Sequence, residues 1–272
     1  MIPKIIHYCW FGGKPLPELA QKCIESWKKY CPGYEIKRWD ETNFDINCCD
    51  YVREAYEAKM WAFVSDYARF KILYENGGVY FDTDVELIKP IDDIIAKGSF
   101  MGLEKSRKEH TAPGLGLAAN AGLGLAKEVL DSYHNSHFEK DENGSYETVV
   151  TRVTNIILKH GDINRDTITE IAEITIYPPE YFCPLNYYTG EMNITENTRS
   201  IHHYMASWII PESRVALLVK KKLCSKGGVR KVIGNILVFV LRAIGKVRKL
   251  GIRKSLEYIL NKIKITKFGS GG

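Results

Sequence analysis

Two aspartates one residue apart, Asp82 and Asp84, are the residues of this chain whose types and spacing point most clearly to chemistry. They follow a short apolar run at 79–81. In an extended chain such residues share one face, and a turn at Thr83 could bring one or both carboxylates onto a single cation. Carboxylate oxygens suit Mg²⁺ or Mn²⁺, which also bind phosphate oxygens of a substrate. A solvated turn after a strand has the same spacing, so the surrounding elements must decide between the two interpretations.

A helix and a strand are predicted directly before the pair. Four aromatic residues recur at helical spacing, and they are Phe63, Tyr67, Phe70 and Tyr74. Gly77-Gly78 then supplies the left-handed stop that helices favour, and the apolar run at 79–81 reads as a short buried strand. Asp66 and Arg69 lie three residues apart on the predicted helix. They are either a surface ion pair or two groups that reach one substrate.

Three blocks of sequence carry a resemblance to a known family. They are SDYARFKILYENGGVYFDTDVE at 65–86, IPKIIHYCWFGG at 2–13 and YFCPLNYYTGEMNITENTRSIHHYMASW at 181–208. In this order they resemble the donor-binding core of the DXD-containing glycosyltransferases of family 32. The resemblance implies an α/β fold of the GT-A (Rossmann-like) nucleotide-sugar type. It also implies transfer, with retention of anomeric configuration, of a hexose from a nucleotide-diphosphate sugar, with Mn²⁺ or Mg²⁺ as cofactor.

The resemblance assigns roles to residues of these blocks. The implied catalytic residues are Asp66, Arg69, Asp82 and Asp84. The implied nucleotide-sugar contacts are His7, Trp10, Gly12, Asp66, Arg69, Tyr80, Asp82, Ser207 and Trp208. Trp10 stands just past the first predicted strand, where its indole would stack on a nucleotide base or, alternatively, cap the core. His7 is expected to face the core or to back the site.

The closing block offers His202 and His203 as a third metal ligand beside Asp82 and Asp84. Imidazole is acceptable to manganese, and adjacent strand residues point to opposite faces, so we expect only one of the two to reach the metal. The sequence leaves open which one does. Ser207 and Trp208 resemble residues that close over the diphosphate.

The glycine-rich segment at 114–126, GLGLAANAGLGLA, resembles a dinucleotide loop only superficially, because it lacks the early βαβ position and a suitable acidic residue downstream. Its glycines are interpreted as permitting tight packing. Asn120, within this segment, is a candidate for acceptor contact.

Strands and helices alternate along the chain, which predicts a layered α/β domain with a largely parallel sheet. The predicted strands are 5–9, 34–39, 79–81, 99–103 and 173–177. The predicted helices are 19–30, 51–59, 63–75, 125–136 and 146–160. Ligands of such sheets bind at the carboxyl ends of the strands, where both Trp10 and Asp82 fall.

Charge divides the chain into a catalytic domain at 1–214, a basic amphipathic segment at 215–268 and a tail at 269–272. The last 58 residues hold 15 of the 38 Lys and Arg but one of the 33 acidic residues, so they are net +14 and the rest is net −9. Apolar residues recur at helical spacing from Val229 to Val247 and from Ile252 to Ile263. This pattern is typical of a helix on an anionic membrane surface, although packing on the catalytic domain would give it too. Nucleic acid ranks last as a partner, because the catalytic domain is acidic.

The seven cysteines form no CxxC pair, and no stretch of about 18 apolar residues is present. These features favour reduced thiols and a cytoplasmic protein held at the inner face of the cell membrane. The predicted function is transfer of a hexose from a UDP-sugar to a glycan or lipid-linked acceptor, in the synthesis of surface (capsular) polysaccharide. Two alternatives are a haloacid-dehalogenase-like phosphohydrolase, with Asp82 as its nucleophile, and a non-catalytic nucleotide-sugar binding protein.

Overall fold

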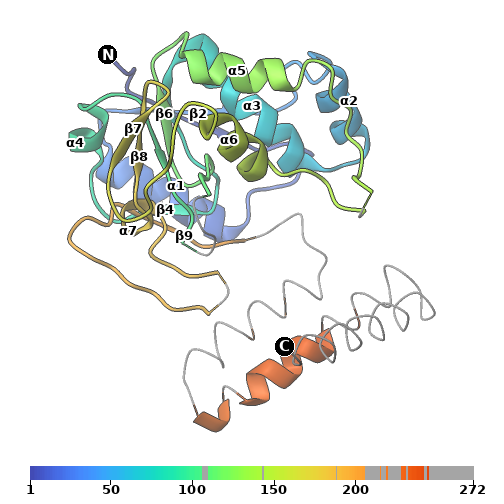
Figure 1. Ribbon diagram of the computed structural model, residues 1–272, viewed down its shortest axis with the longest axis vertical. Helices are drawn as coiled ribbons and strands as arrows, with labels where there is room; N and C mark the ends of the chain where they lie inside the picture. Colours follow the sequence, from blue (N-terminus) through green and yellow to red (C-terminus); the bar gives the residue numbers. More distant parts are fainter. Residues whose placement is uncertain are drawn as a thin grey trace, which may run out of the picture. The chain divides into compact units, whose positions relative to one another are not determined.

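The computed structural model describes residues 1–105, 110–142, 144–187 and 189–205, and, further on, residues 215, 219, 228–230, 232–241 and 244. The chain forms two units (Figure 1). The first comprises Met1–Asn186 and Met192–Tyr204, and the second comprises Tyr187–Glu191 and the segment from Met205 onward. The predicted domain boundary after residue 214 stays a prediction.

A mixed sheet forms the centre of the first unit. Its strands, in spatial order, are β2 (Glu35–Trp39), β1 (Ile5–Cys9), β3 (Gly78–Tyr80), β6 (Leu117–Ala119), β5 (Phe100–Gly102), β8 (Ile174–Tyr177) and β7 (Thr169–Ile171). Parallel pairs are β1–β2, β1–β3 and β5–β8, whereas β3–β6, β5–β6 and β7–β8 are antiparallel. The α/β class predicted from the sequence is therefore confirmed, but the prediction of a largely parallel sheet was wrong. The causes are β6, which enters between β3 and β5 and runs against both, and the edge strand β7, which runs against β8.

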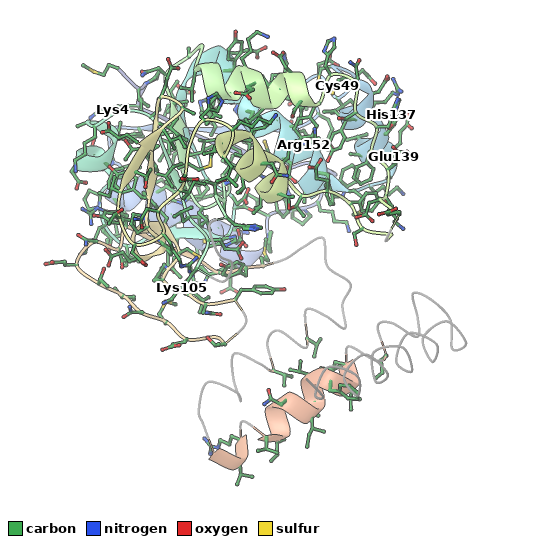
Figure 2. The ribbon with its side chains drawn as sticks, viewed as in Figure 1. Lys4, Cys49, Lys105, His137, Glu139 and Arg152 are labelled. Carbon is green, nitrogen blue, oxygen red and sulfur yellow. The ribbon has the colours of Figure 1, made fainter. Side chains whose placement is uncertain are left out.

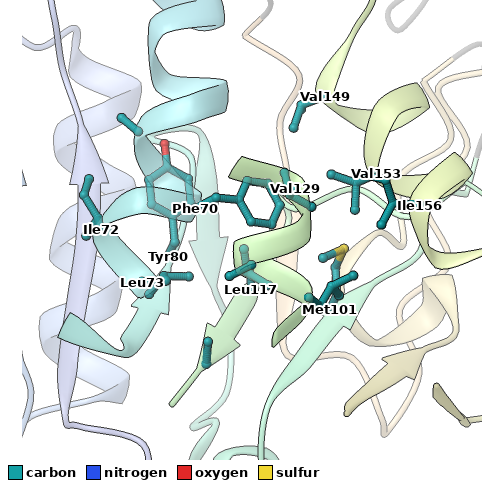
Figure 3. Close-up of a cluster of buried hydrophobic side chains, with 14 of the residues drawn as sticks. Phe70, Ile72, Leu73, Tyr80, Met101, Leu117, Val129, Val149, Val153 and Ile156 are labelled. Carbon is teal, nitrogen blue, oxygen red and sulfur yellow. The ribbon is translucent and has the colours of Figure 1, made fainter. Parts of the chain in front are cut away.

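Helices cover both faces of this sheet (Figure 1). The helices are α1 (Glu18–Tyr30), α2 (Asp50–Glu57), α3 (Trp61–Asn76), α4 (Asp92–Ile95), α5 (Gly124–Ser132), α6 (Val149–Ile157) and α7 (Pro179–Phe182). Helices α2, α3, α5 and α6 share one apolar cluster with one face, and α1, α4 and α7 share another with the opposite face. Successive residues of a strand enter opposite clusters, as Val79 and Tyr80 of β3 do. Figure 3 shows the first cluster, in which Phe70 of α3 lies near Tyr80, Leu117 and Val129.

The junction of α3 and β3 depends on two glycines. The amide of Gly77 donates to the Leu73 carbonyl at 2.8 Å and so ends α3. Gly77 and Gly78 have φ of 65° and 106°, which favour glycine. A Cβ on Gly78 would lie 2.8 Å from the Ile5 carbonyl oxygen. The predicted stop is thus confirmed, and it allows β3 to pair closely with β1.

A second, two-stranded sheet joins β4 (Val85–Leu87) to β9 (Ser200–His202) in antiparallel register, with Val85 opposite His202. Helix α1 fixes β4, because the Trp27 indole donates to the Val85 carbonyl at 2.8 Å. The Leu87 amide also donates to Ser26 Oγ at 2.9 Å. This small sheet brings the end of the first unit beside the turn that follows β3.

In the second unit, residues 228–230 and 232–241 are helical, within the range where an amphipathic helix is predicted. The predicted helix at 252–263 lies outside the described residues. Among the described helices, none is long and apolar enough to cross a bilayer.

Candidate functional site

Asp82, Asp84 and His202 converge after β3. Each offers a ligand atom, and these atoms all lie within 4.8 Å of one another. The Val85 amide donates to the Asp82 carbonyl at 3.0 Å and closes the turn around Thr83. His202 Nε2 lies 3.1 Å from Asp84 Oδ1. Two carboxylates and one imidazole are an acceptable ligand set for Mn²⁺ or Mg²⁺, so the cluster predicted from the sequence can hold a divalent cation.

Strand register selects between the two histidines. His202 lies opposite Val85 and reaches Asp84, whereas His203 Nε2 bonds Glu86 Oε2 at 2.7 Å. The His203 amide donates to the Asp84 carbonyl at 2.9 Å, so it supports the turn through its backbone. His203 is therefore removed from the predicted metal ligands, as expected for neighbours on one strand.

The electrostatics of His202 also suit a cation site. Burial alone would lower its pKa, but the Asp84 carboxylate raises it above the ordinary value. Its Nδ1 is buried and has no hydrogen-bond partner among the described residues. A buried polar atom without a partner is costly, and such atoms concentrate where a ligand binds.

A second charged cluster adjoins the first. Arg69 Nη2 lies 2.9 Å from Asp66 Oδ1 and 3.2 Å from Asp82 Oδ1, and the side chain of Arg69 is only 4% exposed. Its guanidinium lies over the Tyr80 ring, 4.8 Å from the centroid, and the Tyr80 hydroxyl donates to Asp82 Oδ1 at 3.2 Å. The pair on α3 is thus not a surface pair, because Arg69 links the helix to the aspartate after β3.

Burial shifts the proton affinities in this second cluster. Burial raises the pKa of the Asp66 carboxyl to about 7, against the opposing effect of Arg69. Burial would lower the pKa of Arg69, but Asp82, Tyr80 and Asp66 together raise it, so the guanidinium stays charged. A buried cation held by two carboxylates is stable only while both partners stay in place.

Gly114 is a site residue that the sequence interpretation missed. Its carbonyl accepts the Asp82 amide at 3.0 Å. A Cβ on Gly114 would lie 1.9 Å from Asp82 Oδ2 and 3.0 Å from Arg69 Nη1. The glycine-rich segment was interpreted as permitting tight packing, and this glycine does so against the aspartate of the site. The sequence shows that several glycines cluster at 114–126, but it does not show that Gly114 lies against Asp82.

The N-terminal loop reaches the same edge of the sheet. His7 of β1 pairs with Tyr80 of β3 in parallel register, so the residues after both strands lie together. Trp10 is half-buried, and its indole N–H donates to the Lys14 carbonyl at 2.6 Å. Only its ring face is left for a nucleotide base. Gly12 has φ of 90°, and its amide donates to Glu41 Oε1 at 2.6 Å.

Two predicted contacts lie elsewhere. His7 is fully buried, with Nε2 at 2.9 Å from the Gly77 carbonyl and Nδ1 accepting from the Trp39 indole at 3.0 Å. It therefore backs the site, and both ring nitrogens are engaged. Asn120 directly follows Ala119, which pairs with Gly78 at the start of β3, so the structure places it at the opposite end of that strand from Asp82. The structure thus does not bring Asn120 to the aspartates, and its contact with an acceptor stays a prediction. Ser207 and Trp208 lie outside the described residues.

Comparison with known proteins supports the resemblance found in the sequence. Residues 17–101, which include both aspartates of the turn, match the family described as "Glycosyltransferase sugar-binding region containing DXD motif". An uncharacterized glycosyltransferase of Acanthamoeba polyphaga mimivirus is 27% identical over 206 residues, or 70% of this chain and 76% of that protein. Inositol phosphoceramide mannosyltransferase 1 of Schizosaccharomyces pombe is 31% identical over 111 residues, which cover 37% of this chain and 33% of that protein. This chain thus matches about a third of the mannosyltransferase.

Among solved structures, one named PaToxG Glycosyltransferase is 18% identical, with a TM-score of 0.43, and the match covers 58% of this chain and 69% of that chain. The sequence matches, rather than this distant structural one, support the resemblance.

Proposed function

We propose that this chain, which carries the sugar-binding region of the DXD-containing glycosyltransferases, transfers a hexose from a nucleotide-diphosphate sugar to a hydroxyl of a glycan or lipid-linked acceptor. The observation that supports this most strongly is the convergence of Asp82, Asp84 and His202 at the carboxyl edge of β3. Two of these residues lie within the matched region, and the third arrives from a strand far along the chain.

The proposed chemistry divides the work between the two clusters. A divalent cation held by Asp82, Asp84 and His202, most simply Mn²⁺, would stabilise negative charge on the departing diphosphate as a Lewis acid. Asp66 and Arg69 would hold the hydroxyls of the donor sugar. Arg69 keeps Asp82 oriented through the 3.2 Å contact, so the two clusters share one carboxylate. Such preorganised charges cost no reorganisation when the bond breaks.

Retention of the anomeric configuration is part of the proposal. It comes from the family resemblance, with attack by the acceptor hydroxyl on the face that the diphosphate leaves. The Asp66 carboxyl is buried and held by Arg69, so it is placed to bind rather than to attack. Trp10 would contact the nucleotide base through its ring face, as proposed for a uridine donor.

The second unit is proposed to hold the enzyme at an anionic membrane surface. Apolar side chains of its described helix are largely exposed, including Val229 at 74%, Phe239 at 68% and Ile236 at 59%. The segment from 215 onward also carries a net charge of +14. An exposed apolar face combined with basic residues is typical of helices that lie in a lipid interface, where each basic residue adds about 1 kcal/mol. Such placement would suit a lipid-linked acceptor in surface polysaccharide synthesis.

The test is release of nucleotide from a panel of UDP- and GDP-sugars with Mn²⁺, with and without a chelator. The panel includes GDP-mannose, because one relative is named a mannosyltransferase. We expect one donor to be cleaved, and Asp84→Ala to lower the rate by at least about 100-fold, since charge stabilisation of the leaving group is lost. Asp131→Ala, on the exposed face of α5 where the carboxylate pairs with Lys127, is the matched control.

Two outcomes would overturn the proposal. Phosphate release from simple phosphomonoesters without cleavage of any donor would indicate the phosphohydrolase alternative. Tight binding of a nucleotide sugar without turnover, in the presence of acceptor glycans and Mn²⁺, would indicate a binding protein.

A further inference from the structure

A cavity of about 350 Å³ lies in the first unit, between α2, α6 and the segment that joins α5 to α6. Its wall includes Tyr51, Phe138, Tyr146, Glu147 and Arg152. Figure 2 shows Arg152, His137 and Glu139, which also line it, on the same side of the unit. None of these residues belongs to the two clusters described above. The volume is at the lower end of the range of about 300–1,000 Å³ that is usual for ligand pockets.

We propose that this cavity binds a neutral sugar residue of the acceptor. The inference rests on the proposed transfer reaction and names the acceptor side of the same site. The aromatic lining, the charge balance of the wall and the position beside Asp66 support it independently of one another.

Stacked aromatic rings form part of the wall. Phe138 and Tyr146 have ring centroids 4.2 Å apart and planes inclined by only 7°. Tyr51 contacts Phe138 edge-on, at a centroid distance of 5.7 Å. Flat apolar surface next to polar groups suits the C–H face and the hydroxyls of a pyranose, which need both kinds of contact.

The charges of the wall favour a neutral ligand over an anion. Arg152 Nη2 pairs with Glu147 Oε2 at 2.6 Å, and Nη1 donates to the Ser132 carbonyl at 2.7 Å. The guanidinium also lies over the Tyr133 ring, 4.0 Å from the centroid. The positive charge of Arg152 is thus already compensated, and the Glu147 carboxylate, which is 45% exposed, is available to accept hydroxyl hydrogens.

The cavity borders the residues proposed to hold the donor sugar. The carboxylate of Asp66 accepts the amide of Val149, the first residue of α6, two positions after Glu147. Burial, and next the negative charge of Asp66, raise the pKa of Tyr51 in the cavity wall. A sugar in the cavity would therefore lie near Asp66, one of the two residues proposed to hold the donor sugar.

The cavity wall is fixed before any ligand binds. Glu54 of α2 accepts from the Phe138 amide at 2.8 Å, and its other oxygen lies 2.8 Å from His137 Nδ1. These bonds fasten the segment between α5 and α6 to α2. A preformed wall lowers the ordering cost of binding a small ligand.

The experiment is saturation-transfer NMR with the methyl glycosides of mannose, galactose, glucose and N-acetylglucosamine, in the absence of donor. The proteins are the full chain, its Tyr146→Ala and Glu147→Gln variants, and Tyr30→Ala as a matched aromatic control at the end of α1. We expect one glycoside to bind, and Tyr146→Ala to weaken it roughly fivefold, as loss of one aromatic contact does. Glu147→Gln should weaken it also, without removing the stacked rings. Tyr30→Ala should bind the glycoside as the unmodified chain does.

Absence of binding by every glycoside, or binding that neither cavity variant weakens, would overturn the subsite. Thermal denaturation of each variant confirms that it is folded. If Tyr146→Ala does not fold, the binding measured with Glu147→Gln decides the question. The outcome is separable from the donor reaction. Donor cleavage by the unmodified chain, with glycoside binding insensitive to both substitutions, leaves the proposed function in place and removes the subsite. Sensitive glycoside binding without cleavage of any donor retains the subsite and removes the proposed function.

Discussion

Two charged clusters follow β3, and they neutralise their carboxylates in different ways. Asp66 and Asp82 share a cation that the protein itself supplies, the buried guanidinium of Arg69. Asp84 instead faces His202, whose Nδ1 lacks a hydrogen-bond partner among the described residues. The Arg69 cluster already contains a cation of the protein itself, whereas the Asp84 cluster suits an added cation. The difference teaches that two aspartates of one turn can be held differently, Asp82 by a buried guanidinium and Asp84 by a histidine.

Removing the guanidinium of Arg69 should have the largest effect on the protein's stability. We expect Arg69→Met to lower the free energy of unfolding by about 3–5 kcal/mol, because it leaves the largely buried Asp66 and the half-buried Asp82 without their common partner. Chemical denaturation monitored by circular dichroism measures this. Arg53→Met is the control, since Arg53 is 43% exposed and its pair with Asp50 is worth less than about 1 kcal/mol. Equal stabilities of the two variants would contradict the view that the Arg69 cluster stabilises the fold.

The affinity for an added Mn²⁺ ion should depend on one of the two histidines, His202. We expect His202→Ala to weaken Mn²⁺ binding roughly 100-fold, since outer ligand partners alone are worth about 10–100-fold. His203→Ala should leave the affinity nearly unchanged, because its ring bonds Glu86. Isothermal titration calorimetry on both variants compares them directly. A larger loss in the His203 variant would show that the strand register does not decide the ligand.

A substitution of Gly114 tests how closely Asp82 and Arg69 are packed. A side chain there would overlap Asp82 Oδ2, so we expect Gly114→Ala to destabilise the fold by about 1–3 kcal/mol, as overpacking does. Donor cleavage should fall with it, since Asp82 must move. Gly13→Ala is a control for the change in residue type, because a Cβ there meets nothing within 4 Å, although its φ of 65° adds some strain. Equal activity of the two variants would mean that Asp82 can shift freely.

The sequence predicted the elements that depend on local pattern. β1, α1, α3 and β3 lie where apolar spacing and the Gly-Gly stop put them, and the turn with its two aspartates follows as expected. The strand order was not predictable in the same way. β6 is only three residues long, and its apolar, glycine-flanked sequence gives no sign that it pairs antiparallel with β3.

The site was predicted to the same extent. Asp82, Asp84, Asp66 and Arg69 were found from one continuous segment, whereas the choice of His202 depends on pairing between residues more than 100 positions apart. The role of Gly114 and the distance of Asn120 from Asp82 likewise depend on the register of β6. Local spacing shows which residues can react, but long-range pairing determines which of them meet.

The smallest expected effect is the pH dependence of Mn²⁺ binding at His202, which further distinguishes the Asp84 cluster from the Arg69 cluster. Burial opposes protonation of His202, but Asp84 outweighs it and raises the pKa above the ordinary value of 6.5. A cation and a proton compete for this imidazole, so affinity should be highest at alkaline pH and fall as pH drops through the raised pKa. Between pH 6.5 and 5.5 we expect about a tenfold loss of Mn²⁺ affinity, equal to about 1.4 kcal/mol, because one proton is displaced for each ion bound.

Titration calorimetry at a series of pH values gives the slope of Mn²⁺ affinity against pH. In His202→Ala the slope should vanish over this interval, whereas His203→Ala should keep it. Arg69 stays charged over this interval, so an equal slope in His202→Ala would mean that another group, such as the Asp66 carboxyl with its pKa of about 7, exchanges the proton.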